Sequence, residues 1–204
     1  MLFFKKAVTC ALALLAAPSI AALTVSQMVD NINMLTTKSR ALQTPAKSIS
    51  LINGPLIIIG QGPFPQIIVG FTEIITITST AIAQMQGSAS ITAPADATAI
   101  ANAFRTFVKV HQELLNILIG KAGLFSTVPL VGQPVAAVLR QLEAIVDTVA
   151  FAIIDLVDPS TQKMEITSDA ASLSGTIDLS IKSYSGLSVT VKKRHARDFT
   201  TIEA

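Results

Sequence analysis

The sequence has few of the residues that usually carry enzyme chemistry. It contains one cysteine, Cys10, two histidines, His111 and His195, and no tryptophan. A metal site needs clustered His, Cys, Asp or Glu side chains, and the sequence has no such cluster. It also lacks the Gly-x-Ser-x-Gly, His-Glu-x-x-His and phosphate-loop motifs of common enzyme classes. We therefore predict no catalytic residue, no metal site and no cofactor, and expect that the protein is not an enzyme.

Charge is scarce as well. Asp, Glu, Lys and Arg make up 14% of the chain, whereas an ordinary soluble domain has about 25%. Hydrophobic residues make up 50%, and most of them are Ala, Ile, Leu and Val. This composition excludes a disordered chain.

The first 21 residues have the pattern of a secretory signal peptide. Two lysines lie near the start, residues 7–17 form an apolar run, and Ser19-Ile20-Ala21 places small residues before a cleavage point. The apolar run is shorter than the roughly 20 residues that span a bilayer. We exclude residues 1–21 from the fold and predict a secreted protein, extracellular or held in a cell wall.

Cleavage of this peptide changes what the charge implies. Loss of Lys5 and Lys6 lowers Lys+Arg from 15 to 13, which equals the 13 Asp+Glu. The basic pI of the precursor is then no evidence for nucleic-acid binding, and we predict no nucleic-acid partner. Cys10 is lost as well, so the mature chain forms no disulfide and relies on its core.

Five stretches repeat apolar residues every three or four positions, which is the spacing of one helix face. They cover residues 24–44, 66–86, 94–120, 134–157 and 168–184. The stretch 66–86 also alternates like a strand at its "IITITST", but its length favours a helix. Glu73 and several Thr and Ser residues argue against a transmembrane span there, so we expect none in the mature chain.

Residues at the ends of these stretches predict where the helices begin and end. Thr24 and Gln27 have the spacing of a capping box, and Pro45 interrupts or kinks that first helix. Thr92 is a candidate cap for the third helix. Thr167 or Ser168 is expected to cap the last helix, and Gly186 to end it.

Amphipathic helices joined by short loops predict an all-α fold, an antiparallel bundle of about five helices. We assign residues 22–186 to one helical-bundle domain and residues 187–204 to a flexible basic C-terminal tail. The tail contains Lys192-Lys193-Arg194, which is either a solvated charge run or a dibasic processing site.

Two apolar loops, 54–65 and 123–134, are flanked by Gly and Pro. Exposed apolar loops often mark interaction sites, although such loops can equally fold over the bundle ends and cap the core. The candidate surface-contact residues are Leu56, Ile57, Ile58, Ile59, Leu124 and Phe125.

His111 lies within the apolar stripe of the third helix. It is either a hydrogen-bond donor to a lipid carboxylate inside a greasy cavity or a boundary histidine bonded to a neighbour. The residues that we expect to line such a cavity with it are Phe71, Ile75, Phe104, Phe107, Val108, Leu139 and Val146. Phe151 interrupts a polar face, and either contacts a partner or packs under a neighbouring helix or loop.

Four stretches after the signal peptide resemble a family of secreted fungal proteins. They are "VSQMVDNINMLTTKSRAL", "FTEIITITSTAIAQM", "ITAPADATAIANAFRTFVKVHQELLNILIGKAGLF" and "VGQPVAAVLRQLEAIVDTVAFAIIDLV", and the resemblance extends over residues 24–185. The pattern is similar to the hydrophobic surface-binding protein A family, which includes cell-wall galactomannoproteins. The family has no catalytic signature, so no individual site residue is carried over.

That resemblance implies a secreted or wall-held helical bundle. It also implies adsorption to hydrophobic surfaces, recruitment of polyester- or cutin-degrading enzymes such as a secreted esterase or cutinase, and binding of fatty acids between helices. The chain lacks a Ser/Thr/Pro-rich stalk and a C-terminal hydrophobic tail, which argues against covalent wall attachment.

The combined hypothesis is a non-enzymatic secreted protein that binds hydrophobic surfaces or lipids such as fatty acids. The alternative is a structural cell-wall mannoprotein or a module that binds a protein partner. An internal apolar cavity would favour lipid carriage, and a filled core with exposed apolar loops would favour surface adsorption.

Overall fold

The computed structural model describes residues 22–125, 129–158 and 160–198. Its helices are α1 Val25–Lys47, α2 Pro63–Met85, α3 Pro94–Ala122, α4 Pro129–Leu156 and α5 Ser160–Asp198, with short 3-10 helices η1 Gly54–Ile59 and η2 Gly123–Phe125. The predicted all-α bundle is confirmed. The predicted signal peptide lies outside the described residues, and the predicted domain limits stay a prediction.

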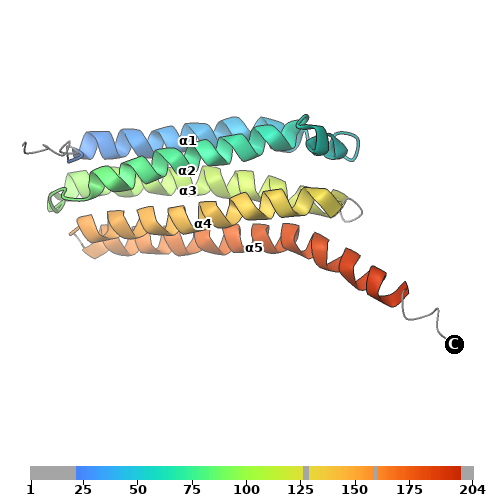
Figure 1. Cartoon of the computed structure of the whole chain (residues 1–204). Coiled ribbons are helices and arrows are strands. Elements are labelled where there is room, and N and C mark those ends of the chain that lie inside the picture. The colour runs from blue at the N-terminus through green and yellow to red at the C-terminus, as the bar shows by residue number, and fades with distance from the viewer. Residues whose placement is uncertain (1–21, 126–128, 159, 199–204) are drawn as a thin grey trace, which may run out of the picture.

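The five helices close into a ring around one core. Each helix packs mainly against two others, in the spatial order α1, α2, α4, α5, α3 and back to α1. Consecutive helices run in opposite directions (Figure 1), so α1, α3 and α5 are parallel to one another and α2 and α4 form the opposite set. Buried apolar side chains from all five helices meet inside this ring in a single cluster.

The helix starts follow local capping chemistry in part. The capping box of Thr24 and Gln27 is confirmed: the Gln27 amide donates to Thr24 Oγ1, and the Thr24 amide donates to Gln27 Oε1 at 2.9 Å. Thr92 does not cap α3, so that prediction is wrong. Ala93 occupies the N-cap position without a side-chain hydrogen bond, and Pro94 removes one of the amides that a cap would otherwise satisfy.

Two helix ends differ from the prediction because prolines lie inside helices. α1 continues past Pro45 to Lys47, and α4 begins at Pro129, so that Pro134 is internal rather than first. An internal proline costs about 3 kcal/mol or more. At Pro134 the burial of the residues that follow it, Val135 and Ala136, offsets this cost.

The fifth helix is longer than predicted at both ends. It begins at Ser160 rather than near Ser168, and its backbone remains helical past Gly186 to Asp198, so both predicted ends are wrong. A glycine costs only about 1 kcal/mol inside a helix, and no proline follows it. In Figure 1 the last turns of α5 extend beyond the end of the bundle.

Helix α2 is long and apolar enough to cross a membrane by length and composition. In the bundle it packs against α1 and α4, with Phe64, Ile67 and Phe71 buried. Its outer face carries Thr72 and Glu73, which are exposed. One apolar face and one polar face indicate a bundle helix rather than a membrane span.

Helices α1 and α2 come into close contact at Gly70. A Cβ atom built on this glycine would lie 2.3 Å from Leu42 Cδ2. We expect Gly70→Val to lower the free energy of unfolding by about 2 kcal/mol, because overpacking of a core usually costs about 1–3 kcal/mol. Urea unfolding followed by circular dichroism measures this change.

The double variant Gly70→Val/Leu42→Ala provides the control for this contact. The valine then occupies space that the shortened Leu42 leaves, so the double variant should lose less stability than the sum of the two single variants. Strictly additive losses would contradict the proposed contact.

Candidate functional site

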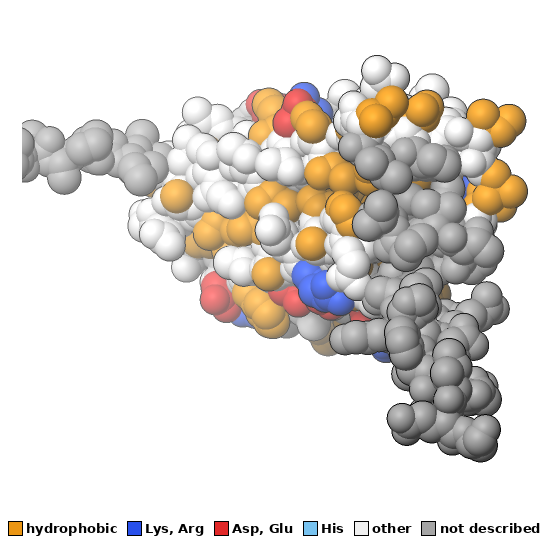
Figure 2. Space-filling model, turned by 45° about the vertical axis from the view of Figure 1, so that its right-hand side comes forward, with side chains coloured by type: hydrophobic (Ala, Val, Ile, Leu, Met, Phe, Trp, Pro, Cys, Tyr) orange, Lys and Arg blue, Asp and Glu red, His pale blue; other side chains and the backbone are white. Residues whose placement is uncertain are grey.

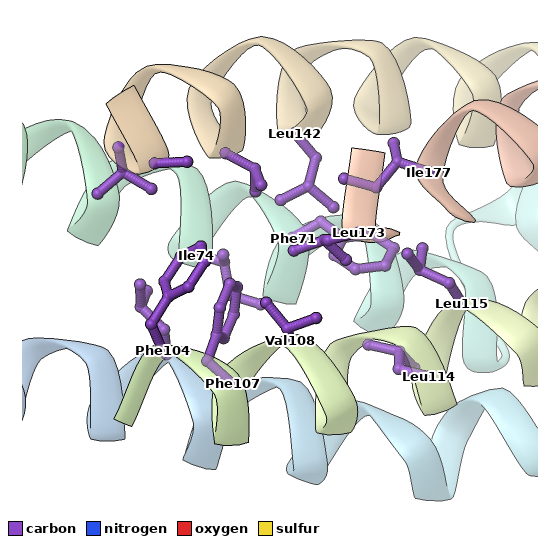
Figure 3. Packing of buried hydrophobic residues seen from close by; sticks show 14 of the residues in the cluster. Phe71, Ile74, Phe104, Phe107, Val108, Leu114, Leu115, Leu142, Leu173 and Ile177 are labelled. Carbon is purple, nitrogen blue, oxygen red and sulfur yellow. The ribbon is translucent and has the colours of Figure 1, made fainter. Parts of the chain in front are cut away.

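The residues predicted to line a cavity meet inside the ring. Figure 3 shows Phe71 of α2 together with Phe104, Phe107 and Val108 of α3, all within the same core. Leu139 and Val146 of α4 are also buried, whereas Ile75 is half-buried and packs against the edge of the cluster. The structure therefore gathers the predicted set, and its role in ligand binding stays a prediction.

His111 is the polar group at the centre of this apolar interior. Its side chain is completely buried, with a relative exposure of 0%. The ring centroid lies 5.9 Å from that of Phe71 and 5.3 Å from that of Phe107. Its Nδ1 atom lies 2.8 Å from the hydroxyl oxygen of Ser39, a buried residue of α1. The alternative prediction, a boundary histidine bonded to a neighbour, is correct about the bond, which Ser39 supplies, and wrong about the position, because His111 lies fully in the core.

The second ring nitrogen of His111, Nε2, is buried and finds no hydrogen-bond partner among the described residues. The Ser39 hydroxyl is hydrogen-bonded to the His111 Nδ1 atom. If Ser39 donates to Nδ1, then Nε2 carries the ring proton and only one donor lacks a partner. The opposite tautomer would leave both the Ser39 hydrogen and Nε2 unsatisfied. We therefore assign the proton to Nε2.

Burial lowers the pKa of His111 from 6.5 to about 4, because the apolar surroundings disfavour the imidazolium form. The ring is therefore neutral at pH 7. A neutral imidazole with its proton on Nε2 presents one hydrogen-bond donor to the interior. That donor can bind an oxygen of a ligand, above all a carboxylate.

Two serines of the interior are absent from the predicted set. Ser39 continues the α1 stripe that contains Leu35 and Leu42, and Ser180 of α5 lies among buried apolar residues with its hydroxyl unsatisfied by any described residue. The signal was present in the sequence, because both serines fall at apolar positions of a helical repeat. A single serine among apolar residues does not break the helical repeat, so the sequence pattern gives no reason to assign it a function.

The predicted surface-contact residues divide into different environments. Ile59 is exposed, whereas Ile57 and Leu124 are partly buried and pack against the core; the surface-contact role of these residues stays a prediction. Leu56 is half-buried. The side chains of Ile58 and Phe125 lie outside the described part of the chain. Two residues that the prediction missed, Leu51 and Ile52, are instead exposed.

The outer surface carries shallow grooves beside Phe151, whose side chain is 66% exposed. One groove of about 240 Å³ lies between α4 and α5, and another of about 370 Å³ lies between α2 and α4. Asp147 lines the first and Asp155 the second. Of the two alternatives for Phe151, packing under a neighbouring helix or loop is therefore wrong, because the side chain is exposed; contact with a partner stays a prediction. Among the described residues, no cluster of His, Cys, Asp and Glu that could hold a metal ion is found.

No protein-family profile matches the chain, and no curated protein matches it. Solved structures do share the fold. Afmp4p, solved in complex with palmitic acid, is similar with a TM-score of 0.69 and 16% identity over 79% of this chain and 99% of that chain.

Two domains of the MP1 protein of Penicillium marneffei have the same fold. Ligand-binding domain 1, solved with arachidonic acids, has a TM-score of 0.63 and 15% identity over 78% of this chain and 95% of that chain. Ligand-binding domain 2, solved with multiple arachidonic acids, has a TM-score of 0.63 and 13% identity over 79% and 94%. At these identities the similarity establishes the fold alone.

Proposed function

We propose that the protein binds a fatty acid inside its five-helix ring, with the carboxylate at His111. The observation that carries this proposal is the fully buried His111 Nε2, a donor without an acceptor among the described residues. An unsatisfied buried donor costs about 1–3 kcal/mol, and a carboxylate oxygen is the acceptor that a fatty acid supplies. The solved complexes of the same fold, with palmitic acid in Afmp4p and arachidonic acids in MP1, support this ligand class.

The acyl chain would lie among the aromatic and aliphatic side chains that surround His111. Phe71 and Phe107 flank the imidazole, and the side chains of α4 and α5 face them across the ring (Figure 3). These side chains pack against one another in the structure, and such a filled core taken alone favours surface adsorption rather than an internal cavity. Internal binding therefore requires that the helices separate to admit the acyl chain. Burial of a long chain then contributes about 0.8 kcal/mol per methylene group.

Bound carboxylate would change the electrostatics of His111. An anionic oxygen beside Nε2 favours the imidazolium form and so raises the pKa of His111 above its value in the free protein. Ser39 holds the imidazole by its Nδ1 atom and so keeps Nε2 directed at the ligand. The pair therefore positions the carboxylate, and the apolar ring selects the acyl chain.

Native mass spectrometry of the mature secreted protein tests the proposal. After lipid removal and incubation with palmitic acid, we expect a complex with bound palmitate and a raised melting temperature. Methyl palmitate has the same chain without the charge, so it should bind at least about tenfold more weakly, because hydrogen bonds to charged groups are about twice as strong as neutral ones. Absence of any palmitate complex would overturn the proposal.

The wider setting of this function is also a proposal. The signal-peptide pattern supports secretion, and the sequence resemblance supports membership of the hydrophobic surface-binding protein A group. In this setting the protein acts as a non-enzymatic carrier of lipid outside the cell or in the cell wall. Recruitment of a secreted esterase or cutinase to a hydrophobic surface would extend the same role.

A second candidate function is the binding of a protein partner in a cell wall. Exposed Phe151, between two grooves and flanked by Asp147 and Asp155, favours it. Aromatic side chains, Phe among them, are enriched in the cores of protein interfaces. Retention of the protein in a wall fraction after detergent washing distinguishes this function from lipid carriage.

A further inference from the structure

One end of the bundle presents apolar side chains to solvent. The connection between α1 and α2, residues 48–62, contains Leu51, Ile52 and Ile59, whose side chains are 57%, 90% and 64% exposed. Figure 2 shows hydrophobic side chains at this end of the molecule. We call these three residues the apolar tip.

The apolar tip is held in place by its own segment. The Asn53 side chain accepts the Ser50 amide through Oδ1 and donates to the Ser48 carbonyl through Nδ2, both at 2.8 Å. Lys121 of α3 donates to the Ile49 carbonyl at 3.0 Å, and the Ile49 side chain is buried. These contacts fix the segment to the bundle, so its exposed apolar side chains have a defined position at the surface.

Charge is distributed unevenly between the two ends. The connection itself, residues 48–62, contains no charged residue; Lys47 precedes it, and Lys121 contacts it through the Ile49 carbonyl. The nearest acid along the chain is Glu73, which lies within α2 and pairs with Lys38. The opposite end of the bundle has three exposed acids. Asp96 lies in the first turn of α3, Asp155 in the last turn of α4, and Asp158 just after α4. The apolar tip is therefore bordered by positive charge and remote from these acids.

We propose that the apolar tip docks on a lipid bilayer whose headgroups carry negative charge. Leu51, Ile52 and Ile59 would enter the boundary between headgroups and acyl chains, while Lys47 faces the anionic headgroups. This combination of inserted apolar side chains and flanking basic residues is the chemistry of interfacial binding. Docking goes beyond the proposed function, because it supplies a source of lipid and does not require that the ring bind fatty acid.

A second copy of this chain fits the apolar tip less well. In a symmetric dimer through this end, the Lys47 residues of two copies would approach one another, and like charges across an interface oppose association. A neutral hydrophobic surface would bury the same side chains but would gain nothing from Lys47. Vesicle composition and ionic strength separate these occupants.

Co-sedimentation with vesicles tests the proposal. We expect the full mature protein to bind vesicles of phosphatidylcholine mixed with phosphatidylglycerol more tightly than phosphatidylcholine alone, and added salt to reduce the difference. The variant Leu51→Ser/Ile52→Ser/Ile59→Ser should bind mixed vesicles at least about tenfold more weakly. Lys47→Glu should also weaken binding to mixed vesicles and leave binding to phosphatidylcholine unchanged.

The matched control removes three other exposed apolar side chains. The variant Met34→Ser/Met164→Ser/Leu179→Ser changes residues that are 46%, 66% and 53% exposed but lie outside the apolar tip, and it should bind vesicles like the wild type. Circular dichroism checks that each variant folds. If the triple tip variant does not fold, the single variant Ile52→Ser is used for the same test.

Three results would overturn the docking proposal. They are no binding of the wild type to mixed vesicles, equal losses in the tip and control variants, or a dimer that the tip variant dissociates without any vesicle binding. Palmitate binding from solution should be the same for the tip variant and the wild type. If the wild type binds vesicles but does not bind palmitate, the proposed function is refuted and the docking proposal is unaffected.

Discussion

The variant His111→Leu should bind palmitic acid about 10-fold to 100-fold more weakly than the wild type at pH 7. A hydrogen bond to a charged group contributes about 1.5–3 kcal/mol, and His111 Nε2 is the buried donor that the proposed carboxylate would use. His111→Gln retains a side-chain amide donor and should keep most of the affinity. Isothermal titration calorimetry with lipid-free protein measures both variants.

The control for this prediction is another buried polar residue. Thr78 of α2 is buried, but its hydroxyl already donates to the Ile74 carbonyl at 2.8 Å, so it has nothing to offer a ligand. Thr78→Val should therefore leave palmitate affinity unchanged. Equal affinities of His111→Leu and the wild type would remove His111 from the site while leaving internal lipid binding open to another anchor, such as Ser180.

The second large effect should appear in the pH dependence of stability. Burial lowers the pKa of His111 from 6.5 in the unfolded chain to about 4 in the folded protein, so the unfolded state binds more protons between these values. Stability therefore rises with pH across this window and is lost as the pH falls from 6.5 towards 4. The change from this residue is about 3 kcal/mol, since one pKa unit corresponds to about 1.4 kcal/mol.

Urea unfolding of the lipid-free protein at pH 7 and at pH 4 measures this loss. The contacts of the imidazole come from Ser39, Phe71 and Phe107, and none of these side chains titrates in this range. The side chain of His111→Gln does not titrate either. The loss of stability between pH 7 and pH 4 should therefore be about 3 kcal/mol smaller in this variant than in the wild type. Parallel pH profiles of the wild type and His111→Gln would contradict the prediction, because they would show that the pKa of His111 is the same in the folded and unfolded states.

The helices themselves were predictable because their signals are local. The apolar repeat of the third stretch places Phe104, Phe107 and His111 on one face through the 3.6-residue period alone. The capping box at Thr24 depends on residues three apart and is formed as predicted. The strand-like "IITITST" lies in α2, where Thr76, Ser79 and Thr80 are exposed and Thr78 is buried. All four hydroxyls donate to backbone carbonyls four residues earlier, which a helix permits.

The failures lie where tertiary contacts outweigh local signals. Pro134 is an ordinary signal for the first turn of a helix and Gly186 for a helix end, yet both lie inside helices. At Pro134 the packing of the flanking residues into the core decides the outcome. Similarly, the isolated bridge between Ile91 and Val157 joins the segment before α3 to the residue after α4, and no local sequence pattern predicts a contact between segments so far apart in the chain.

The sequence by itself determined an all-α chain with one polar histidine in its best apolar stripe, because helical periodicity and composition are properties of neighbouring residues. Only the tertiary structure decided that α1 lies beside α3 and so brings Ser39 to His111 Nδ1. Closure of the ring then removed water from Nε2 and left it without a partner. It also decided that Leu51 and Ile52 are exposed while Ile57 packs inward. Burial depends on which helices become neighbours, and that choice is made by the packing of the whole chain.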